Sequence, residues 1–182
     1  LMVYLSDVTD FELLRQKYDN EKLCLAYVRF DNYEDVMKGM SETTRANISG
    51  EVNEVLSKWA EEENGFISRS NKELCLIGFN QAVLRDLMEQ KFPVLDSVRE
   101  IHVGNKITPT VSIGIACEGD NLEELSQNAV KALDLALGRG GDQVVVAVDG
   151  GTQFFGGTTT VTAKSTRVRA RIVAHTIHEQ II

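Results

Sequence analysis

The chain lacks several features that would place it in a common functional class. Acidic residues outnumber basic residues by 27 to 19, and the formal net charge is −8. Because a nucleic-acid backbone binds to a clustered positive surface, this balance excludes nucleic acid as the main partner. No apolar run is long enough to cross a membrane, and no signal peptide is visible. Leu1 is not a natural start, so we expect an excised fragment of a longer protein.

Cysteine and histidine are scarce, and their spacing does not fit a zinc site. The three cysteines, Cys24, Cys75 and Cys117, each lie in an apolar run typical of a strand. We therefore expect reduced thiols that pack as small hydrophobic side chains. His175 and His178 have a spacing that suits a metal ion on a helix face, but no third ligand accompanies them, so we expect no metal there.

The segment from Thr108 to Val146 carries the clearest structural pattern. Residues 111–116, VSIGIA, alternate apolar and small side chains, which predicts a strand that another backbone approaches closely on one face. Asn121 with Glu124 three residues later is typical of a helix N-terminus, and Gly138 is typical of a helix end. The segment therefore predicts a strand, a helix and a second strand.

The rest of the chain predicts strands and helices in a mixed order. Residues 2–5 resemble a last strand of a preceding unit. The expected strands are 23–30, 66–68, 74–79 and 144–148, and the expected helices are 31–39, 43–63, 80–92 and 93–103. This order implies an α/β (α+β) sandwich, in which helices cover a mostly antiparallel or mixed central sheet.

Residues 7–22 predict a helix with an apolar seam formed by Phe11, Leu14 and Tyr18. The string LSDVTDFELLRQKYDNEK resembles the end of a PAS domain followed by the signalling helix that joins it to an output domain. Two interpretations stay open. The seam pairs with its copy in a parallel homodimer, as in short coiled coils, or the helix packs on its own domain.

The strand SIGIA, the helix with NAVKALDLAL and the following glycine-rich turn together resemble the C-terminal half of GGDEF domains. The resemblance implies the palm-like fold of nucleotidyl cyclases. It also implies that an active member uses two carboxylates to hold Mg²⁺ ions, which bridge phosphates and polarise the 3′-hydroxyl for in-line attack.

The first strand departs from the family's motif at the residues that carry this chemistry. Asp31 matches the second Asp of the motif, but Arg29 stands in place of the first, and Met37 stands in place of the Asn that reads guanine. A guanidinium repels a cation and has no lone pair to donate. We expect Arg29 to form an ion pair with Asp31 or Glu73 on the same sheet face.

The signature hairpin departs further. By strand spacing, Gly-Gly-Asp-Glu-Phe corresponds to residues 70–74, Ser-Asn-Lys-Glu-Leu, with a possible slip of one residue. The two glycines that let a backbone approach a nucleotide are gone, although Asn71 can still turn. Lys72 reverses a charge, and Glu73 alone keeps the carboxylate of the motif.

The phosphate anchors of the family are also missing. Leu137 and Gly141 stand where the family has a Lys and an Arg, and Arg139 is a partial substitute. The string Gly-Gly-Asp at 140–142 follows a helix instead of preceding one. We therefore predict a helix-ending turn there, and not a phosphate-cradling loop.

Residues 151–182 contain GGTQFFGG and the chain's basic cluster, Lys164, Arg167, Arg169 and Arg171, which we interpret as a solvated helix face. With the PAS-like start and the degenerate GGDEF pattern, this exit resembles the membrane-bound cyclic-di-AMP phosphodiesterases of the GdpP/YybT type. The resemblance implies a PAS end and signalling helix at 1–22, a degenerate GGDEF domain at 23–150, and a linker at 151–182 leading to a DHH phosphodiesterase domain absent from this chain.

The resemblance implies a parent that hydrolyses cyclic-di-AMP with Mn²⁺ in that missing DHH/DHHA1 domain. It also implies a place on the cytoplasmic face of the membrane, reached through N-terminal helices of the parent. For the fragment, the main hypothesis is a regulatory, dimerising domain without cyclase activity, whose partners are a second copy and the neighbouring PAS and phosphodiesterase domains. The alternative is weak Mg²⁺-dependent ATP binding and hydrolysis, with Asp31 and Glu73 as metal and catalytic candidates and Asn71 and Arg139 as further nucleotide contacts. Diguanylate cyclase activity is the third and least expected hypothesis.

Overall fold

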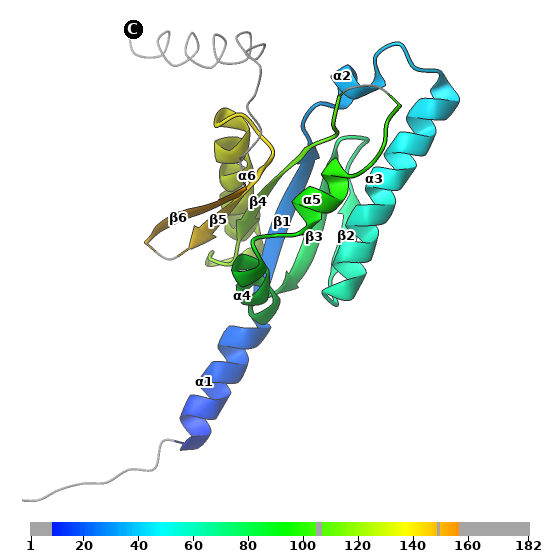
Figure 1. Cartoon of the computed structure of the whole chain (residues 1–182). Helices are drawn as coiled ribbons and strands as arrows, with labels where there is room; N and C mark the ends of the chain where they lie inside the picture. The colour runs from blue at the N-terminus through cyan, green and yellow to red at the C-terminus, as the bar shows by residue number, and fades with distance from the viewer. Residues whose placement is uncertain (1–8, 105–106, 149, 157–182) are drawn as a thin grey trace, which may run out of the picture.

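A six-stranded sheet in the order β2-β3-β1-β4-β5-β6 forms the centre of the computed structural model, which describes residues 9–104, 107–148 and 150–156 (Figure 1). Strands β4 and β5 are parallel, and every other neighbouring pair is antiparallel. This confirms the expected mixed sheet flanked by helices. Along the chain the elements are α1 (Thr9–Glu21), β1 (Leu23–Phe30), α2 (Tyr33–Met37), α3 (Glu42–Glu62), β2 (Phe66–Arg69), β3 (Leu74–Asn80), α4 (Gln81–Gln90), α5 (Val94–Arg99), β4 (Val111–Ala116), α6 (Leu122–Gly138), β5 (Gln143–Val148) and β6 (Gly151–Gly156).

The alternation of side chains along β1 assigns the two faces of the sheet. Every second residue from Cys24 to Phe30 belongs to the larger core, which also contains the buried residues of α3, α4 and α5. Leu25 and Tyr27 point to the other face and pack with α6 residues such as Leu125 and Ala129. Figure 1 shows the same division, with α6 on one side of the sheet and α3, α4 and α5 on the other.

Helix α6 lies very close to β4 at Gly114. A Cβ atom at this position would come 2.0 Å from the backbone nitrogen of Leu133 and 2.4 Å from the backbone oxygen of Ala129. No side chain fits such a space, so glycine is required for this approach. The prediction of a close backbone approach on one face of this strand is therefore confirmed.

Most predicted elements occur where the sequence pattern placed them. The side chain of Asn80 accepts a hydrogen bond from the backbone N–H of Val83 (3.0 Å) at the start of α4, and Asn121 accepts one from Glu124 (2.9 Å) at the start of α6. Helix α5 is shorter than predicted and ends at Arg99. The predicted strand at 2–5, the basic cluster and the two histidines near the C-terminus lie outside the described residues.

Strand β6 is an element that the sequence pattern did not predict. It pairs antiparallel with β5, and Gly150 turns the chain between them with a φ of 80°. Phe155 packs edge-on against Phe92, with ring centroids 5.1 Å apart. Strand β6 has only six residues with a glycine at each end, so apolar and polar side chains do not alternate clearly enough to predict it. Its formation depends instead on pairing with β5 and on the aromatic contact of Phe155.

Two of the three cysteines are bonded to each other, which corrects the expectation of three reduced thiols. Cys24 and Cys117 form a disulfide, with Cα atoms 4.2 Å apart. The reason is the register of β1 and β4, because the pair Leu25–Ala116 places Cys24 and Cys117 next in line across the two antiparallel strands. Cys75 is a buried free cysteine, and burial raises the pKa of its thiol to about 11.

Helix α1 projects away from the sheet, and none of its residues is buried (Figure 1). It packs near α4, where Arg85 hydrogen-bonds Asn20. The seam residues Phe11, Leu14 and Tyr18 are 65%, 66% and 69% exposed. The described part of the domain thus leaves the seam uncovered. None of the helices in the described ranges has the length and apolar composition of a membrane span.

Candidate functional site

An open cleft lies between the β2–β3 hairpin and the C-terminal half of α6, with β1 contributing to its lining. Its volume is about 530 Å³. This is the place at which the sequence resemblance puts the nucleotide of an active cyclase. The lining residues are Tyr27, Arg29, Asn71, Lys72, Glu73, Leu74, Val130, Leu133, Asp134 and Leu137.

Arg29 and Glu73 form an ion pair in this cleft. The Arg29 Nη2 atom lies 3.6 Å from the Glu73 Oε2 atom, and the two side chains are 47% and 35% exposed. Arg29 is opposite Leu74, the first residue of β3, and Glu73 lies in the hairpin immediately before that strand. The expected ion pair of Arg29 is therefore confirmed, with Glu73 as the partner.

Asn71 holds the hairpin that presents Glu73. Its side-chain Oδ1 atom accepts hydrogen bonds from the backbone N–H groups of Glu73 (2.8 Å) and Leu74 (2.9 Å). This is the local turn that an Asn favours, and it replaces the conformational freedom of the two glycines in the family motif. The oxygen of Asn71 is therefore engaged in shaping the loop, and Lys72 lies at the tip between Asn71 and Glu73.

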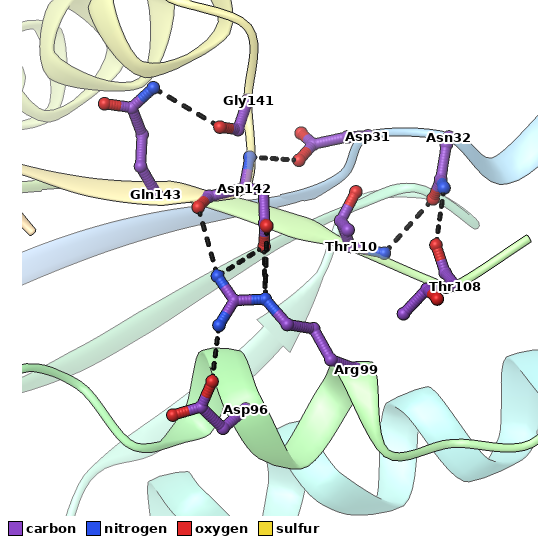
Figure 2. Close-up of polar contacts among 9 residues, drawn as sticks. All are labelled: Asp31, Asn32, Asp96, Arg99, Thr108, Thr110, Gly141, Asp142 and Gln143. Carbon is purple, nitrogen blue, oxygen red and sulfur yellow. Dashed lines mark hydrogen bonds and ion pairs between the residues drawn. The ribbon is translucent and has the colours of Figure 1, made fainter. Parts of the chain in front are cut away.

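Asp31 lies just beyond β1 and points toward the turn after α6 (Figure 2). Its Oδ2 atom accepts a hydrogen bond from the backbone N–H of Asp142 (2.9 Å). The backbone N–H of Asp31 donates to the carbonyl of Thr110 (2.9 Å) on the other side. Asp31 therefore ties β1 to the α6–β5 turn, and it is absent from the lining of the cleft.

The carboxyl of Asp31 is only partly satisfied. Its Oδ1 atom and the hydroxyl oxygen of Ser112 are both buried, and neither forms a hydrogen bond of good geometry with the described residues, although the nearby hydroxyls of Ser112 and Thr110 slightly lower the pKa of Asp31. Burial raises the pKa of Asp31 to about 6, against the opposing effect of the hydrogen bond from Asp142. This carboxyl thus carries a desolvation cost when it is ionised.

The turn at 140–142 is the predicted helix-ending turn, and the Gly-Gly-Asp string has no part in a signature hairpin. Gly140, Gly141 and Asp142 have φ values of 115°, 78° and 55°. A Cβ atom on Gly141 would lie 2.9 Å from the Asp31 Oδ2 atom, so glycine is needed here for both its φ and its lack of a side chain.

Arg99 is a key polar residue that sequence reasoning missed (Figure 2). Its Nε atom donates to the Asp142 Oδ1 atom (2.9 Å), its Nη2 atom lies 2.8 Å from the same oxygen, and its Nη1 atom binds Asp96. The Asp142 side chain is 4% exposed, and burial raises its pKa while the guanidinium of Arg99 opposes that shift. A buried Asp requires such a cation, but nothing in the sequence pairs positions 99 and 142.

Arg139 is directed away from the cleft. Its guanidinium lies 4.3 Å from the centre of the Phe154 ring in β6, and its Nε atom donates to the side-chain oxygen of Gln143 (3.3 Å). The four nucleotide candidates are therefore divided. Asn71 and Glu73 lie in the cleft, whereas Asp31 and Arg139 are used in contacts around the α6–β5 turn.

The residues of the cleft do not fit the pair of metal ions that an active cyclase of this fold would use. A guanidinium occupies the position of the first carboxylate and is paired with the remaining one, Glu73. Asp31 contributes no oxygen to the lining of the cleft. Within the described ranges there is no group of three or more His, Cys, Asp or Glu side chains that could hold a metal ion.

Solved structures with the same arrangement of elements define the fold. The structure is similar to the GGDEF domain of DgcB from Caulobacter crescentus, with a TM-score of 0.59 and 19% identity over 75% of this chain and 86% of that chain. It is also similar to a diguanylate cyclase/phosphodiesterase from Caldicellulosiruptor saccharolyticus, with a TM-score of 0.61 and 16% identity over 79% of this chain and 87% of that chain. The fold is that of a GGDEF domain.

The sequence comparisons identify the family within this class. A family model described as "Cyclic-di-AMP phosphodiesterase GdpP-like, GGDEF domain" matches residues 28–154. The chain is 38% identical over 179 residues to the cyclic-di-AMP phosphodiesterase GdpP of Bacillus subtilis, covering 98% of this chain and 27% of that protein. It is 36% identical over 181 residues to the cyclic-di-AMP phosphodiesterase PdeA of Listeria monocytogenes, covering 99% of this chain and 28% of that protein.

The chain therefore belongs to the GGDEF domain family of GdpP-like cyclic-di-AMP phosphodiesterases. It spans little more than a quarter of the length of these curated relatives.

The raised pKa of Asp31 predicts a pH-dependent stability that Asp31→Asn removes. Between the ordinary pKa of 3.8 and about 6, the folded protein binds more protons at this site than the unfolded chain does. The contribution of Asp31 to stability therefore falls as pH rises through this window. The side chain introduced by Asp31→Asn can still accept the hydrogen bond from Asp142 but does not ionise. We therefore expect the free energy of unfolding of Asp31→Asn, relative to that of the wild type, to rise by up to about 3 kcal/mol from pH 4 to pH 7. Urea unfolding at both pH values measures this, and parallel curves for the two proteins would contradict it.

Proposed function

We propose that this chain is a degenerate GGDEF domain that regulates and dimerises a membrane-bound cyclic-di-AMP phosphodiesterase, and that it has no diguanylate cyclase activity. One observation carries the proposal, the ion pair of Arg29 and Glu73 in the cleft. The family of the chain supports the rest, since its relatives are named as cyclic-di-AMP phosphodiesterases and are much longer than this chain.

The ion pair removes the step that cyclisation needs. Formation of a cyclic dinucleotide requires a metal ion to polarise the 3′-hydroxyl and to neutralise charge on the transferred phosphoryl group. Arg29 has no lone pair for a metal ion, and it draws Glu73, the other candidate ligand, into an ion pair. Hydrolysis of cyclic-di-AMP belongs in this proposal to the DHH/DHHA1 domain of the parent, with Mn²⁺ there. In this scheme the membrane is reached through the parent's N-terminal helices, which places the domain at the cytoplasmic face.

The exposed seam of α1 supports the dimerising role. Phe11, Leu14 and Tyr18 are spaced by three and four residues and thus share one side of the helix. Each is about two-thirds exposed, although each carries a large apolar surface. Burial of that surface against a second copy would remove apolar area from water, and a helix that joins a PAS domain to this sheet would then relay the sensor's state through the dimer.

A second candidate function is weak Mg²⁺-dependent binding and hydrolysis of ATP. The observation that favours it is the cleft, whose volume of about 530 Å³ lies within the range of small-molecule sites and whose lining combines apolar and charged side chains. Glu73 lies in this cleft, whereas Asp31 supports the neighbouring turn.

The wild-type chain should produce no cyclic-di-GMP from GTP with Mg²⁺ or Mn²⁺, and Arg29→Asp should restore a site for a divalent cation. The substitution replaces a repelling cation by a carboxylate beside Glu73, so we expect Mn²⁺ binding by calorimetry in the variant and none at this site in the wild type. Arg69→Asp, on the edge strand β2 and outside the lining of this cleft, is the matched control. Formation of cyclic-di-GMP by the wild type would overturn the proposal.

Charged residues in the seam should prevent dimerisation. We expect Phe11→Glu combined with Leu14→Glu to shift the chain from dimer to monomer in sedimentation equilibrium, because four carboxylates would then face one another across the pair. Leu13→Glu is the control, since Leu13 is 59% exposed on the same helix but lies about 100° around the axis from Leu14. A wild type that stays monomeric at high concentration would exclude the seam as a dimer interface.

If the second candidate is correct, the two acidic side chains should affect ATP hydrolysis differently. Glu73→Ala should abolish Mg²⁺-dependent turnover with little change in the thermal midpoint. Asp31→Ala should lower the midpoint, since it removes the acceptor for the backbone of Asp142 in a buried turn. Phosphate release and thermal denaturation, measured on the same preparations, separate the two effects. Full turnover in both variants would mean that neither carboxyl takes part.

A further inference from the structure

We propose that the basic segment 164–172 of this chain docks in a groove between α3 on one side and α4 and α5 on the other. The groove belongs to the described part of the domain, on the face of the sheet opposite to α6, and the segment lies outside the described residues (Figure 1). The inference depends neither on dimerisation nor on the loss of cyclase activity. In the proposed function, docking would fix the place at which the phosphodiesterase domain begins.

The groove has an apolar floor. Its volume is about 310 Å³, and its floor contains Val55 and Trp59 from α3, Leu87 from α4, and Pro93 and Val94 at the start of α5. Trp59 is 7% exposed, and its indole N–H is buried without an acceptor among the described residues. A groove between helices with such a floor suits the apolar side chains of a peptide segment.

The rim of the groove is acidic where two helices end. Glu62 and Glu63 line the groove at the C-terminus of α3, Glu61 precedes them, and the last turn of α3 has no basic residue. Helix α4 also ends at the groove, with Glu89 in a last turn that has no basic residue. The C-terminus of a helix carries a negative partial charge, so carboxylates are unfavourable there and a cation is favourable.

This negative charge is only partly compensated within the described residues. Glu62 forms an exposed ion pair with Lys58, with 3.7 Å between the Nζ and Oε1 atoms. Glu63 has no ion-pair partner among the described residues, and its pKa is raised by burial and by the nearby carboxylates of Asp86 and Glu62. A cationic partner at this rim would relieve that repulsion.

The chain leaves the described domain beside the groove. Strand β6 ends at Gly156, where a Cβ atom would lie 2.8 Å from the Leu95 Cδ1 atom of α5. Val94 of the same helix lines the groove, so the groove lies about one helix diameter, roughly 10 Å, from the end of β6. Residues 157–163 can span roughly 23 Å when extended, which is enough to bring segment 164–172 to the groove.

The sequence of segment 164–172, KSTRVRARI, complements the groove. It contains four basic residues and no acidic residue, in a chain whose net charge is −8. Val168 and Ile172 are four residues apart, and so are Arg167 and Arg171 beside them. In the proposed arrangement, the two apolar side chains enter the floor and the arginines reach the acidic rim. The sequence alone predicts a solvated face for this segment, and the groove offers it a partner.

The test is energy transfer within the whole chain, from Trp59 to a dansyl group on Ala174→Cys. Trp59 is the only tryptophan of the chain. Cys75 is buried and the other two native cysteines are bonded to each other, so the label reacts at the introduced cysteine. We expect transfer in the docked chain to fall at least twofold when the salt concentration is raised from 0.05 M to 1 M, because salt screens exposed charges.

Reversal of the charges identifies the docking site. We expect Arg167→Glu combined with Arg171→Glu to lower the transfer about twofold or more, and Glu62→Arg combined with Glu63→Arg to do the same. A chain that carries all four substitutions should recover the transfer, since the opposite charges face each other again. Thermal denaturation of each variant checks that a loss of transfer is not a loss of fold.

The matched control is Glu51→Arg combined with Glu54→Arg, which reverses two charges on α3 outside the lining of the groove. It should leave the transfer unchanged, and an equal loss in this control would show only general attraction to an acidic surface and overturn the inference. Unchanged transfer in both reversals at the groove, or no recovery in the combined variant, would also overturn it.

Dilution of the labelled chain with excess unlabelled chain identifies the source of the segment. We expect the transfer to stay constant, because the segment docks on its own copy. A fall on dilution would show that the groove takes the segment of a second copy and would overturn the assignment to the same chain. These measurements leave the tests of cyclase activity and of the α1 seam untouched, so the inference and the proposed function can fail separately.

Discussion

The contact between α6 and β4 at Gly114 is the constraint on which the rest of the domain depends. A Cβ at this position would overlap the backbone of α6, so the helix can approach the sheet only because the residue is glycine. This contact fixes the distance of α6 from the sheet. Leu133 and Leu137 of α6 thereby form one wall of the cleft. The same contact places the end of α6 next to Asp31, whose carboxylate accepts a hydrogen bond from the backbone of Asp142 in the turn at 140–142. One packing contact thus sets both the cleft and the polar network beside it.

That network gives Asp31 a structural role. Asp31 and Asp142 are both buried acids near each other, which is unfavourable, and each of their pKa values is raised by burial. Arg99 compensates the charge of Asp142, and the backbone N–H of Asp142 partly compensates Asp31. The arrangement joins β1, α5 and the α6–β5 turn. Asp31 therefore connects two elements of the fold, and it does not line the cleft.

The sequence predicted the fold well because the fold depends on local patterns. The alternation in SIGIA and the caps at Asn80 and Asn121 predicted the order of strands and helices, and the resemblance to GGDEF domains supplied the palm-like arrangement. An ion pair of Arg29 was also predictable, since a half-buried arginine needs a neighbour on the same face, but the sequence left its partner open between Asp31 and Glu73. The role of Arg99, the disulfide of Cys24 with Cys117 and strand β6 were not predictable. Each depends on register or packing between distant segments, which a single sequence does not display.

The arrangement of α1 and β1 limits how a signal in the helix could act on the cleft. Only Lys22 separates the end of α1 from β1, and Arg29 lies near the far end of that strand. Strand β1 is hydrogen-bonded to β3 on one side and to β4 on the other, so a local distortion would break a ladder in the centre of the sheet. A rotation of α1 would therefore cost free energy if it were transmitted along β1 as a distortion of the strand. In the proposed dimer, such a rotation is more readily transmitted as a rigid reorientation of the whole domain, so the proposed relay would act through the relative placement of the two copies.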